Sequence, residues 1–523
     1  MGRIGGCAAT TARYAPAAAG AATMAVMGLW GSARDAMGND EVATHYAALL
    51  SLRQLFHLLS NVDAVHGTYY LLMHGWMALG ASPTIMRIPS LISMTAAAAI
   101  IVIIGRRLTG SGWAGLFAGL IMALTPVITF YAQTARSYAM VFTCVLGSTL
   151  ALLRALEAET GKRTDARIAR RWLSYGALVT LGGYMNELSL LVLAAHAVTV
   201  LLTRHGRRTV AHWAAAATAG AVLVVPLVLI SIPESSQIGW ITRPDFKDLG
   251  TLFHDYFGGT TVAPVLVFAL AAAALLPPRS TWRLRRGGAS RDAGTISESA
   301  WWRRGGVSLP SVAAPLLVVP ASVLILESLL ARPLYIDRYV LYGEAGAALL
   351  AGAGLYRIGR WLSHAADRRA LTWALGASLC LCVFLLQLGL YHFIRTPGSR
   401  EFNYGGPARY VRVNAQPGDG VLFFNSFYRK ARLGYPRDFQ EVSDFAMAVP
   451  PMEAGTFNGL NKPFAVIRPL MLAHRRIWVV GRSPYAVLRS PPIRGEGELL
   501  KSRFTLIAER HFKGIVITLW LRR

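Results

Sequence analysis

Apolar segments long enough to cross a membrane alternate with short polar segments over the first 392 residues of the chain. A helix needs about 20 apolar residues to cross the hydrocarbon core of a bilayer. The first such segment, residues 14–33, ends in Gly-Ser-Ala-Arg without a convincing cleavage site, so we interpret it as a retained helix. The pattern predicts a polytopic α-helical membrane protein, with residues 1–392 forming a module of about eleven transmembrane helices.

One apolar segment, residues 67–82, is shorter than the others and contains His74 together with tyrosine and tryptophan. Tyrosine and tryptophan are enriched at membrane–water interfaces. We therefore interpret this segment as a helix that lies in or dips into the outer face of the membrane. On this interpretation, residues 34–87 form a first outer loop that contains juxtamembrane helices.

The pattern changes from residue 393 onward. Residues 408–416 have a helical pattern, a Pro-Gly-Asp-Gly turn follows, and short apolar runs then alternate with polar segments. The runs that we expect to be strands are residues 421–424, 477–480, 504–508 and 514–521. Residues 393–523 are therefore predicted to form a small extracytoplasmic α/β domain.

Composition and charge agree with a membrane protein. The chain is 54% hydrophobic and 15% charged, and its net charge of +26 would suggest nucleic-acid binding in a soluble protein. Here the basic residues lie in short loops between apolar segments, so the positive-inside rule explains them and no nucleic-acid partner is expected. These loops are Arg106–Arg107, 155–171, 204–208, 278–305 and 357–369.

Placing the basic loops in the cytoplasm gives a cytoplasmic N-terminus and an outer C-terminal domain. The chain is rich in alanine and arginine, which indicates a GC-rich bacterial genome and hence a bacterial plasma membrane. The four cysteines have neither metal-ligand spacing nor a plausible disulfide partner.

The candidate chemistry lies at the predicted outer face. Only 27 carboxylates accompany 53 lysines and arginines, yet Asp40, Glu41 and Asp63 occur together in the first outer loop. A carboxylate can act as a general base, and an arginine can bind a phosphate in a bidentate manner. Aromatic side chains at the same face can pack against a sugar ring. The combination favours a substrate that is both anionic and attached to a lipid.

Five segments in this order resemble one known family. They are Asn-Asp-Glu (39–41), Asp-Ala-Val-His-Gly-Thr-Tyr-Tyr-Leu-Leu-Met-His (63–74), Met-Arg-Ile-Pro-Ser (86–90), Tyr-Ala-Gln-Thr-Ala-Arg-Ser-Tyr-Ala (131–139) and Asp-Arg-Tyr-Val-Leu-Tyr (337–342). The chain resembles, over residues 13–392, the GT-C membrane glycosyltransferases of family 39. This group includes protein O-mannosyltransferases and aminoarabinose transferases, and the likeness is greatest to their actinobacterial members.

The resemblance implies roles for individual residues. Asp40 matches the catalytic aspartate of such enzymes, and Arg136 with Arg338-Tyr339 matches contacts to the donor phosphate. Thr134 stands where many relatives have a glutamate. Supporting or acceptor-binding roles are expected for Glu41, Asp63, His66, Tyr69 and Glu187. No cofactor is required, although a divalent cation is compatible with the resemblance.

The expected reaction is an inverting transfer of a sugar from a polyprenyl-phosphate donor to a glycan, lipid or protein acceptor of the cell envelope. Mannose and arabinose are the first choices for the sugar, on the basis of the resemblance.

Alternatives remain open from the residues alone. A transporter or flippase of lipid-linked sugars would use acids within apolar segments, such as Glu327 and Glu344. A non-catalytic relative would have an outer domain that mainly binds partners or a wall polymer. The arginines of the C-terminal region could attract the phosphates of membrane lipids or such an anionic polymer. Asp40 is also compatible with simple capping of a helix over residues 41–58, and Asp63 with capping of the helix that follows it. His66 is compatible with an interfacial anchor.

Overall fold

A computed structural model describes residues 2–34, 37–161, 164–234, 239–245, 262–276, 306–365, 369–482 and 494–523, together with 247–248, 250, 252 and 254. The predicted basic loop at 278–305 lies outside these residues. The chain forms two compact units: Met1–Trp30 with Pro89–Tyr391, and Gly31–Ile88 with His392–Arg523.

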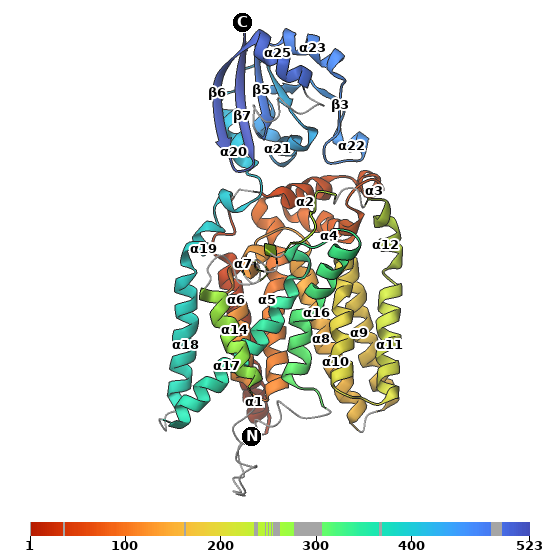
Figure 1. Ribbon diagram of the computed structural model, residues 1–523, viewed down its shortest axis with the longest axis vertical. Helices are drawn as coiled ribbons and strands as arrows, with labels where there is room; N and C mark the ends of the chain where they lie inside the picture. The colour runs from red at the N-terminus through yellow and green to blue at the C-terminus, as the bar shows by residue number, and fades with distance from the viewer. Residues whose placement is uncertain are drawn as a thin grey trace, which may run out of the picture. The chain divides into compact units, whose positions relative to one another are not determined.

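The first unit is a bundle of helices (Figure 1). Its described helices are α1 (Gly2–Leu29), α5 (Pro83–Thr109, of which residues 89–109 belong here), α6 (Gly112–Ala123), α7 (Pro126–Ala132), α8 (Tyr138–Thr160), α9 (Asp165–Met185), α10 (Val192–Leu202), α11 (Arg207–Val222), α12 (Val225–Ser231), α14 (Val262–Leu275), α16 (Leu309–Leu330), α17 (Glu344–Ala365), α18 (Arg369–Leu386) and α19 (Leu388–Phe393). Short 3-10 turns η3 (Glu187–Leu191), η6 (Asp337–Tyr339) and η7 (Leu341–Gly343) lie between them.

The core of this unit is formed by apolar side chains from α1, α5, α6, α8, α16 and α17. Glycines allow close helix contacts: a Cβ on Gly354 would lie 1.9 Å from the carbonyl oxygen of Leu270, and one on Gly115 would lie 2.3 Å from that of Val102. Small residues let helix backbones approach in this way within membranes.

Three described helices are long and apolar enough to cross a membrane: α5, α8 and α16. Two bent pairs, α6 with α7 and α11 with the α12 segment, raise this number to five if each pair is one span. The predicted polytopic helical architecture is therefore confirmed, whereas the count of eleven stays a prediction.

The second unit combines the first predicted outer loop with the C-terminal region. The loop contains α2 (Asn39–Leu49), α3 (Leu52–Leu59), η1 (Ala64–His66), α4 (Gly67–Trp76) and η2 (Met77–Leu79). With ten residues, α4 is about 15 Å long, half the thickness of a hydrocarbon core. Helix α4 lies against α2, where His74 Nδ1 is 3.0 Å from the carbonyl oxygen of Ala48.

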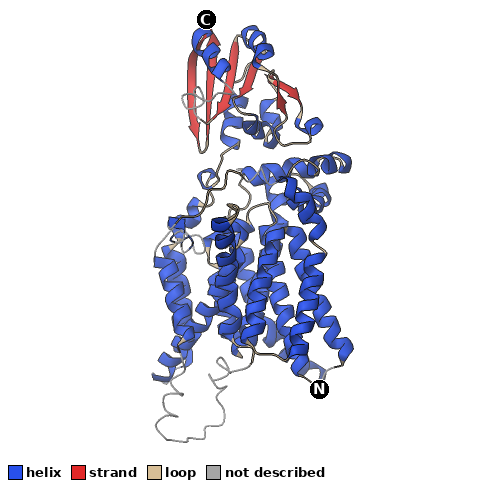
Figure 2. Ribbon diagram, turned by 45° about the vertical axis from the view of Figure 1, so that its right-hand side comes forward, coloured by secondary structure: helices blue, strands red, loops and turns tan. Residues whose placement is uncertain are grey.

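The C-terminal region contains a five-stranded sheet of order β2-β1-β5-β7-β6, flanked by helices (Figure 2). The strands are β1 (Asp419–Phe423), β2 (Val442–Asp444), β5 (Arg476–Gly481), β6 (Phe504–Phe512) and β7 (Ile515–Arg522). Strands β2, β1 and β5 are parallel, and β7 and β6 continue the sheet in antiparallel fashion. Strands β3 (Met447–Val449) and β4 (Leu460–Asn461) form a separate pair.

Side chains from helices cover this sheet. Ile467 of α23 (Phe464–Ala473) and Leu500 of α25 (Arg494–Arg503) share a core with Ile477 and Val479. Trp478 contacts Tyr410 of α20 (Gly405–Asn414). Burial on both faces explains why β5 is continuously apolar over residues 477–480. The predicted strand-containing C-terminal domain is confirmed.

Candidate active site

Asp40 lies in the first turn of α2. The helix begins after Gly38, whose backbone N–H donates to Glu41 Oε2 at 3.2 Å, and the Asp40 carbonyl accepts from Thr44 Oγ1 at 3.0 Å. Asp40 is therefore not the capping residue. A negative charge in the first turn of a helix is stabilised by the helix dipole. The position favours an ionised, half-buried carboxylate.

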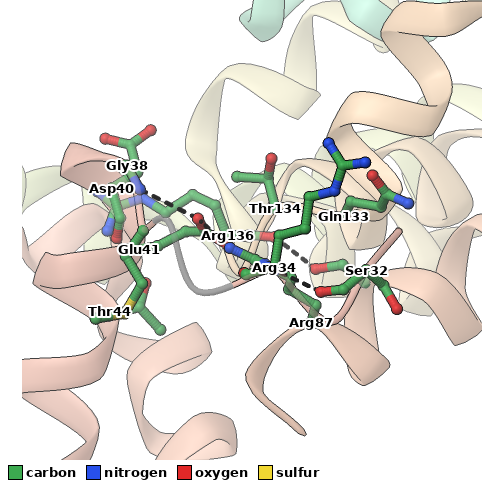
Figure 3. Close-up of polar contacts among 12 residues, drawn as sticks. Ser32, Arg34, Gly38, Asp40, Glu41, Thr44, Arg87, Gln133, Thr134 and Arg136 are labelled. Atoms are coloured by element: carbon green, nitrogen blue, oxygen red, sulfur yellow. Dashed lines mark hydrogen bonds and ion pairs between the residues drawn. The ribbon is translucent and has the colours of Figure 1, made fainter. Parts of the chain in front are cut away.

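Glu41, the next residue, is committed to structure. It is 1% exposed and forms a bidentate ion pair with Arg87, with Nε–Oε1 at 2.7 Å and Nη2–Oε2 at 3.0 Å. Arg400 Nη2 lies 3.9 Å from Glu41 Oε2. Figure 3 shows the Glu41 side chain between Gly38 and Arg87, and the Asp40 carboxylate directed away from it. Glu41 thus holds the first turn of α2 to Arg87, and its supporting or acceptor-binding role stays a prediction.

Arg87 extends this network to the start of the loop. Its Nη1 donates to the carbonyl oxygens of Ser32 at 2.8 Å and Arg34 at 2.6 Å. One buried guanidinium therefore fixes both the chain before α2 and the first turn of α2. Arg87 lies within the Met-Arg-Ile-Pro-Ser segment, whose sequence alone does not indicate this role.

Asn39 connects α2 to the C-terminal domain. Its Oδ1 accepts from Lys430 Nζ at 2.9 Å and from Tyr404 Oη at 3.2 Å. The Lys430 ammonium also lies 4.5 Å from the centre of the Phe427 ring. Burial raises the pKa of Tyr404, and the nearby Asp40 carboxylate contributes to that rise. Two C-terminal side chains thus hold the residue that precedes Asp40.

Asp63, His66 and Tyr70 form a second cluster in the same unit. Tyr70 Oη donates to Asp63 Oδ2, and His66 Nε2 is 4.0 Å from Asp63 Oδ1. Asp63 has a positive φ of 63°, a conformation that is uncommon outside glycine and often found at functional sites. Its side chain makes no capping bond. Tyr69 and Tyr70 are both fully buried, and Tyr70 is the one that donates to the Asp63 carboxylate.

In the first unit, Arg136 lies in the turn between α7 and α8. Gln133 Nε2 donates to the carbonyl oxygens of Gly28 and Trp30, both at 2.8 Å, and Ser90 Oγ donates to the Arg136 carbonyl at 3.2 Å. The turn is thereby held to the end of α1 and to α5. Arg136 itself is 6% exposed.

Arg338 lies close to the same turn. Its guanidinium carbon is 5.8 Å from the ring centres of both Tyr138 and Tyr339. Tyr138 is only two residues after Arg136, so the structure brings the two arginines expected at the donor phosphate onto neighbouring segments. Burial raises the pKa of Asp337, and the adjacent Arg338 charge opposes this rise.

The remaining candidate acids, Glu187 and Glu344, each lie within hydrogen-bonding distance of a hydroxyl group. Glu187 Oε2 accepts from Ser231 Oγ at 2.8 Å, and the Asn186 side chain caps η3. Glu344 is fully buried at the start of α17, where Oε1 is 3.3 Å from Thr125 Oγ1. The described residues contain no cluster of three or more histidine, cysteine, aspartate or glutamate side chains that could hold a metal ion.

Comparisons with known proteins agree with this fold. Residues 67–231 match the family model described as dolichyl-phosphate-mannose-protein mannosyltransferase. By sequence, no curated protein matches the chain.

Solved structures are similar over nearly the whole chain. ArnT from Cupriavidus metallidurans in the apo state has 12% identity and a TM-score of 0.57, covering 98% of each chain. ArnT bound to undecaprenyl phosphate has 13% identity and a TM-score of 0.52, covering 95% of this chain and 96% of that one. The oligosaccharyltransferase AglB from Archaeoglobus fulgidus has 11% identity and a TM-score of 0.50, covering 97% and 74%. The chain therefore shares its fold with ArnT and AglB, and part of it, residues 67–231, matches a glycosyltransferase family model.

Proposed function

We propose that this protein transfers a sugar, mannose or arabinose, from a polyprenyl-phosphate donor to a cell-envelope acceptor on the outer face of the membrane, with inversion at the anomeric carbon. The GT-C fold supports the reaction class. A neighbour of the same fold, ArnT, has been solved with undecaprenyl phosphate, which supports a polyprenyl-phosphate donor for this chain.

The proposal rests on the different contacts of two adjacent carboxylates. Glu41 is buried and bonded to Gly38 and Arg87, whereas the Asp40 carboxylate lies outside that pair. A carboxylate on a rigid helix turn is suited to act as a general base. We therefore assign the base role to Asp40.

In the proposed step, Asp40 accepts the proton of the acceptor hydroxyl. The hydroxyl oxygen forms a bond to the anomeric carbon on the side opposite the phosphate. The bond between that carbon and the phosphate oxygen breaks, and polyprenyl phosphate leaves with its negative charge. Arg338 and Arg136 are proposed to stabilise that charge, because guanidinium groups bind phosphate in a bidentate manner.

The test is a transfer assay with purified protein in detergent. Polyprenyl-phosphate mannose and polyprenyl-phosphate arabinose, each radiolabelled, are incubated with envelope acceptors, and the linkage of the product is determined. The proposal expects an inverted glycoside from one of the two donors. Failure of both donors, together with protein-dependent movement of the lipid-linked sugar across vesicles, would instead support a flippase.

The phosphate-binding role is tested with Arg338→Gln. Loss of a charged group that stabilises the leaving phosphate is expected to lower turnover by about 10²-fold. The exposed Arg243 provides the matched control, and Arg243→Gln is expected to retain turnover. Equal activity of the two variants would remove Arg338 from the proposed mechanism.

A further inference from the structure

The second unit contains a large groove whose lining residues do not include Asp40. Its volume is ≈ 1330 Å³, which is larger than the about 300–1,000 Å³ typical of small-molecule pockets. The walls come from α20, from the chain before α2, and from residues 395–397 and 434–435. A groove of this size fits an extended ligand.

The charge of the groove is strongly positive. Arg34, Arg395, Arg409 and Arg412 line it, and Asp438 is the single carboxylate among the lining residues. Arg412 Nη1 is 3.5 Å from Asp438 Oδ1, which compensates one of the four positive charges. Arg395 is 3% exposed, and its carbonyl accepts from Arg34 Nη1. Clustered guanidinium groups are suited to carboxylate or phosphate ligands.

Aromatic side chains occupy fixed positions in the same walls. Tyr410 packs edge-on against Trp478, with ring centres 5.8 Å apart, and Tyr435 Oη accepts from the backbone N–H of Met37 at 3.0 Å. Phe512 lies against Gly406, where an added Cβ would be 2.4 Å from its ring. Rigid aromatic faces provide apolar contact area at a low entropic cost, and such faces can pack against sugar rings.

We propose that this groove binds an acidic saccharide, a chain of sugar units that carries carboxylate or phosphate groups, and that this saccharide is the acceptor. The arginines would bind the anionic groups, and Tyr410, Tyr435 and Phe512 would contact the sugar rings. The inference rests on the proposed transferase function and names its acceptor class. A membrane lipid headgroup would use the arginines but would not require the aromatic walls.

Equilibrium binding to the full-length protein in detergent tests the inference independently of catalysis. The probes are tetragalacturonate, which is acidic, and maltotetraose, which is a neutral chain of the same length. The wild-type protein is expected to bind only the acidic probe. Arg409→Glu is expected to weaken this binding at least about tenfold, because it places a like charge in the groove. The exposed Arg468 on α23 is outside the groove, and Arg468→Glu is the control.

Three outcomes would overturn the inference: no binding of tetragalacturonate, equal weakening by Arg468→Glu, or binding that persists in Arg409→Glu. Binding to nanodiscs of phosphatidylglycerol is measured in parallel, as a test for recognition of a lipid headgroup. If the Arg409→Glu effect appears only with these nanodiscs, the groove recognises lipid and the acidic-saccharide assignment is wrong. Tyr410→Ala gives a second variant, which should weaken tetragalacturonate binding and leave nanodisc binding unchanged. If Arg409→Glu lost tetragalacturonate binding but retained sugar transfer, the groove would not be the acceptor site, and the proposed transferase function would stand.

Discussion

Two neighbouring carboxylates at the start of α2 have different surroundings and therefore different predicted roles. Glu41 accepts hydrogen bonds from Gly38 and from the Arg87 guanidinium, and both partners of the ion pair are buried. Removing one partner of a buried ion pair leaves an uncompensated charge. Asp40 is not part of this pair. The two residues can thus be separated by experiment.

Arg87→Met is expected to destabilise the protein by about 3–5 kcal/mol, because it leaves the Glu41 charge buried without its partner. Thermal unfolding of the detergent-purified protein measures the change. The exposed pair of Arg208 and Asp165 is the control: Asp165→Asn should change stability by no more than about 1 kcal/mol. Similar melting temperatures for Arg87→Met and the wild type would show that the pair does not hold the loop.

His45 predicts a pH dependence of stability. Burial lowers the pKa of His45 from its ordinary value of 6.5, and a hydrogen bond with the Ala81 backbone opposes this shift. Below pH 6.5 the unfolded chain therefore binds a proton that the folded protein does not, so stability falls as the pH decreases. The slope from this one group is at most about 1.4 kcal/mol per pH unit.

His45→Gln should flatten this dependence between pH 6.5 and pH 5. Melting temperatures of the variant and the wild type, measured over this range, provide the check. An unchanged slope in His45→Gln would assign the acid sensitivity to other groups.

At the residue scale, the sequence indicates the position of Asp40 but not what holds it. Arg87 is 46 positions from Glu41, and Lys430 is 391 positions from Asn39. Contacts at such separations leave no periodic signal in one sequence. The positive φ of Asp63 is also a property of the fold, and so is the contact of Asp63 with Tyr70 rather than with Tyr69, since both tyrosines are buried.

At the element scale, the orientation of α2 depends on its contacts at both ends. Its first turn is bonded to Arg87, Lys430 and Tyr404. In the last turn of α2, the carbonyl oxygen of Ala48 lies 3.0 Å from Nδ1 of His74 on α4. The helix that carries Asp40 is therefore positioned by side chains from four other segments.

Lys430→Met is expected to lower kcat about tenfold with little change in KM for the donor, because a displaced base slows the chemical step more than it weakens binding. Lys430 is thus a positioning residue, since it acts through Asn39. Lys462, which donates to the Phe445 carbonyl at 3.0 Å, provides a matched lysine in the same domain. Lys462→Met should leave kcat unchanged. A fall in kcat of the same size in both variants would indicate a general loss of structure.

Helices and strands could be predicted from the sequence where their hydrophobic pattern is long or strongly apolar. The expected strands at 421–424, 477–480, 504–508 and 514–521 correspond to β1, β5, β6 and β7. Strands β2, β3 and β4 have only two or three residues each, too few for a period-two pattern to be recognised. A continuous helix at 41–58 is wrong, because Ser51 starts a new helix: its side chain accepts from the N–H of Gln54.

At the scale of the whole molecule, the fold class could be predicted, because repeated apolar segments leave few architectures for a chain of this length. Which segments of the chain make up the second unit could not be predicted. Residues 31–88 and 392–523 are separated by about three hundred residues, yet they form one compact unit. Charge patterning predicts on which side of the membrane these segments lie.

That sidedness can be measured with single cysteines in a cysteine-free background. An impermeant maleimide applied to intact cells is expected to label Arg53→Cys in the first loop and Val413→Cys in the C-terminal domain, both exposed positions. Arg207→Cys, in a predicted cytoplasmic loop, should react only after permeabilisation. The opposite labelling pattern would reverse the topology and exclude a reaction at the outer face.

The most direct measurement is the rate of sugar transfer by Asp40→Asn, with donor binding determined in parallel. The substitution preserves size and removes the proton-accepting charge, so turnover should fall by about 10²–10⁴-fold while the Kd for donor changes little. Glu453→Gln, at an exposed first-turn carboxylate of α22 (Pro451–Ala454), is the control and should transfer at the wild-type rate. Transfer by Asp40→Asn at the wild-type rate would contradict the assignment of the base.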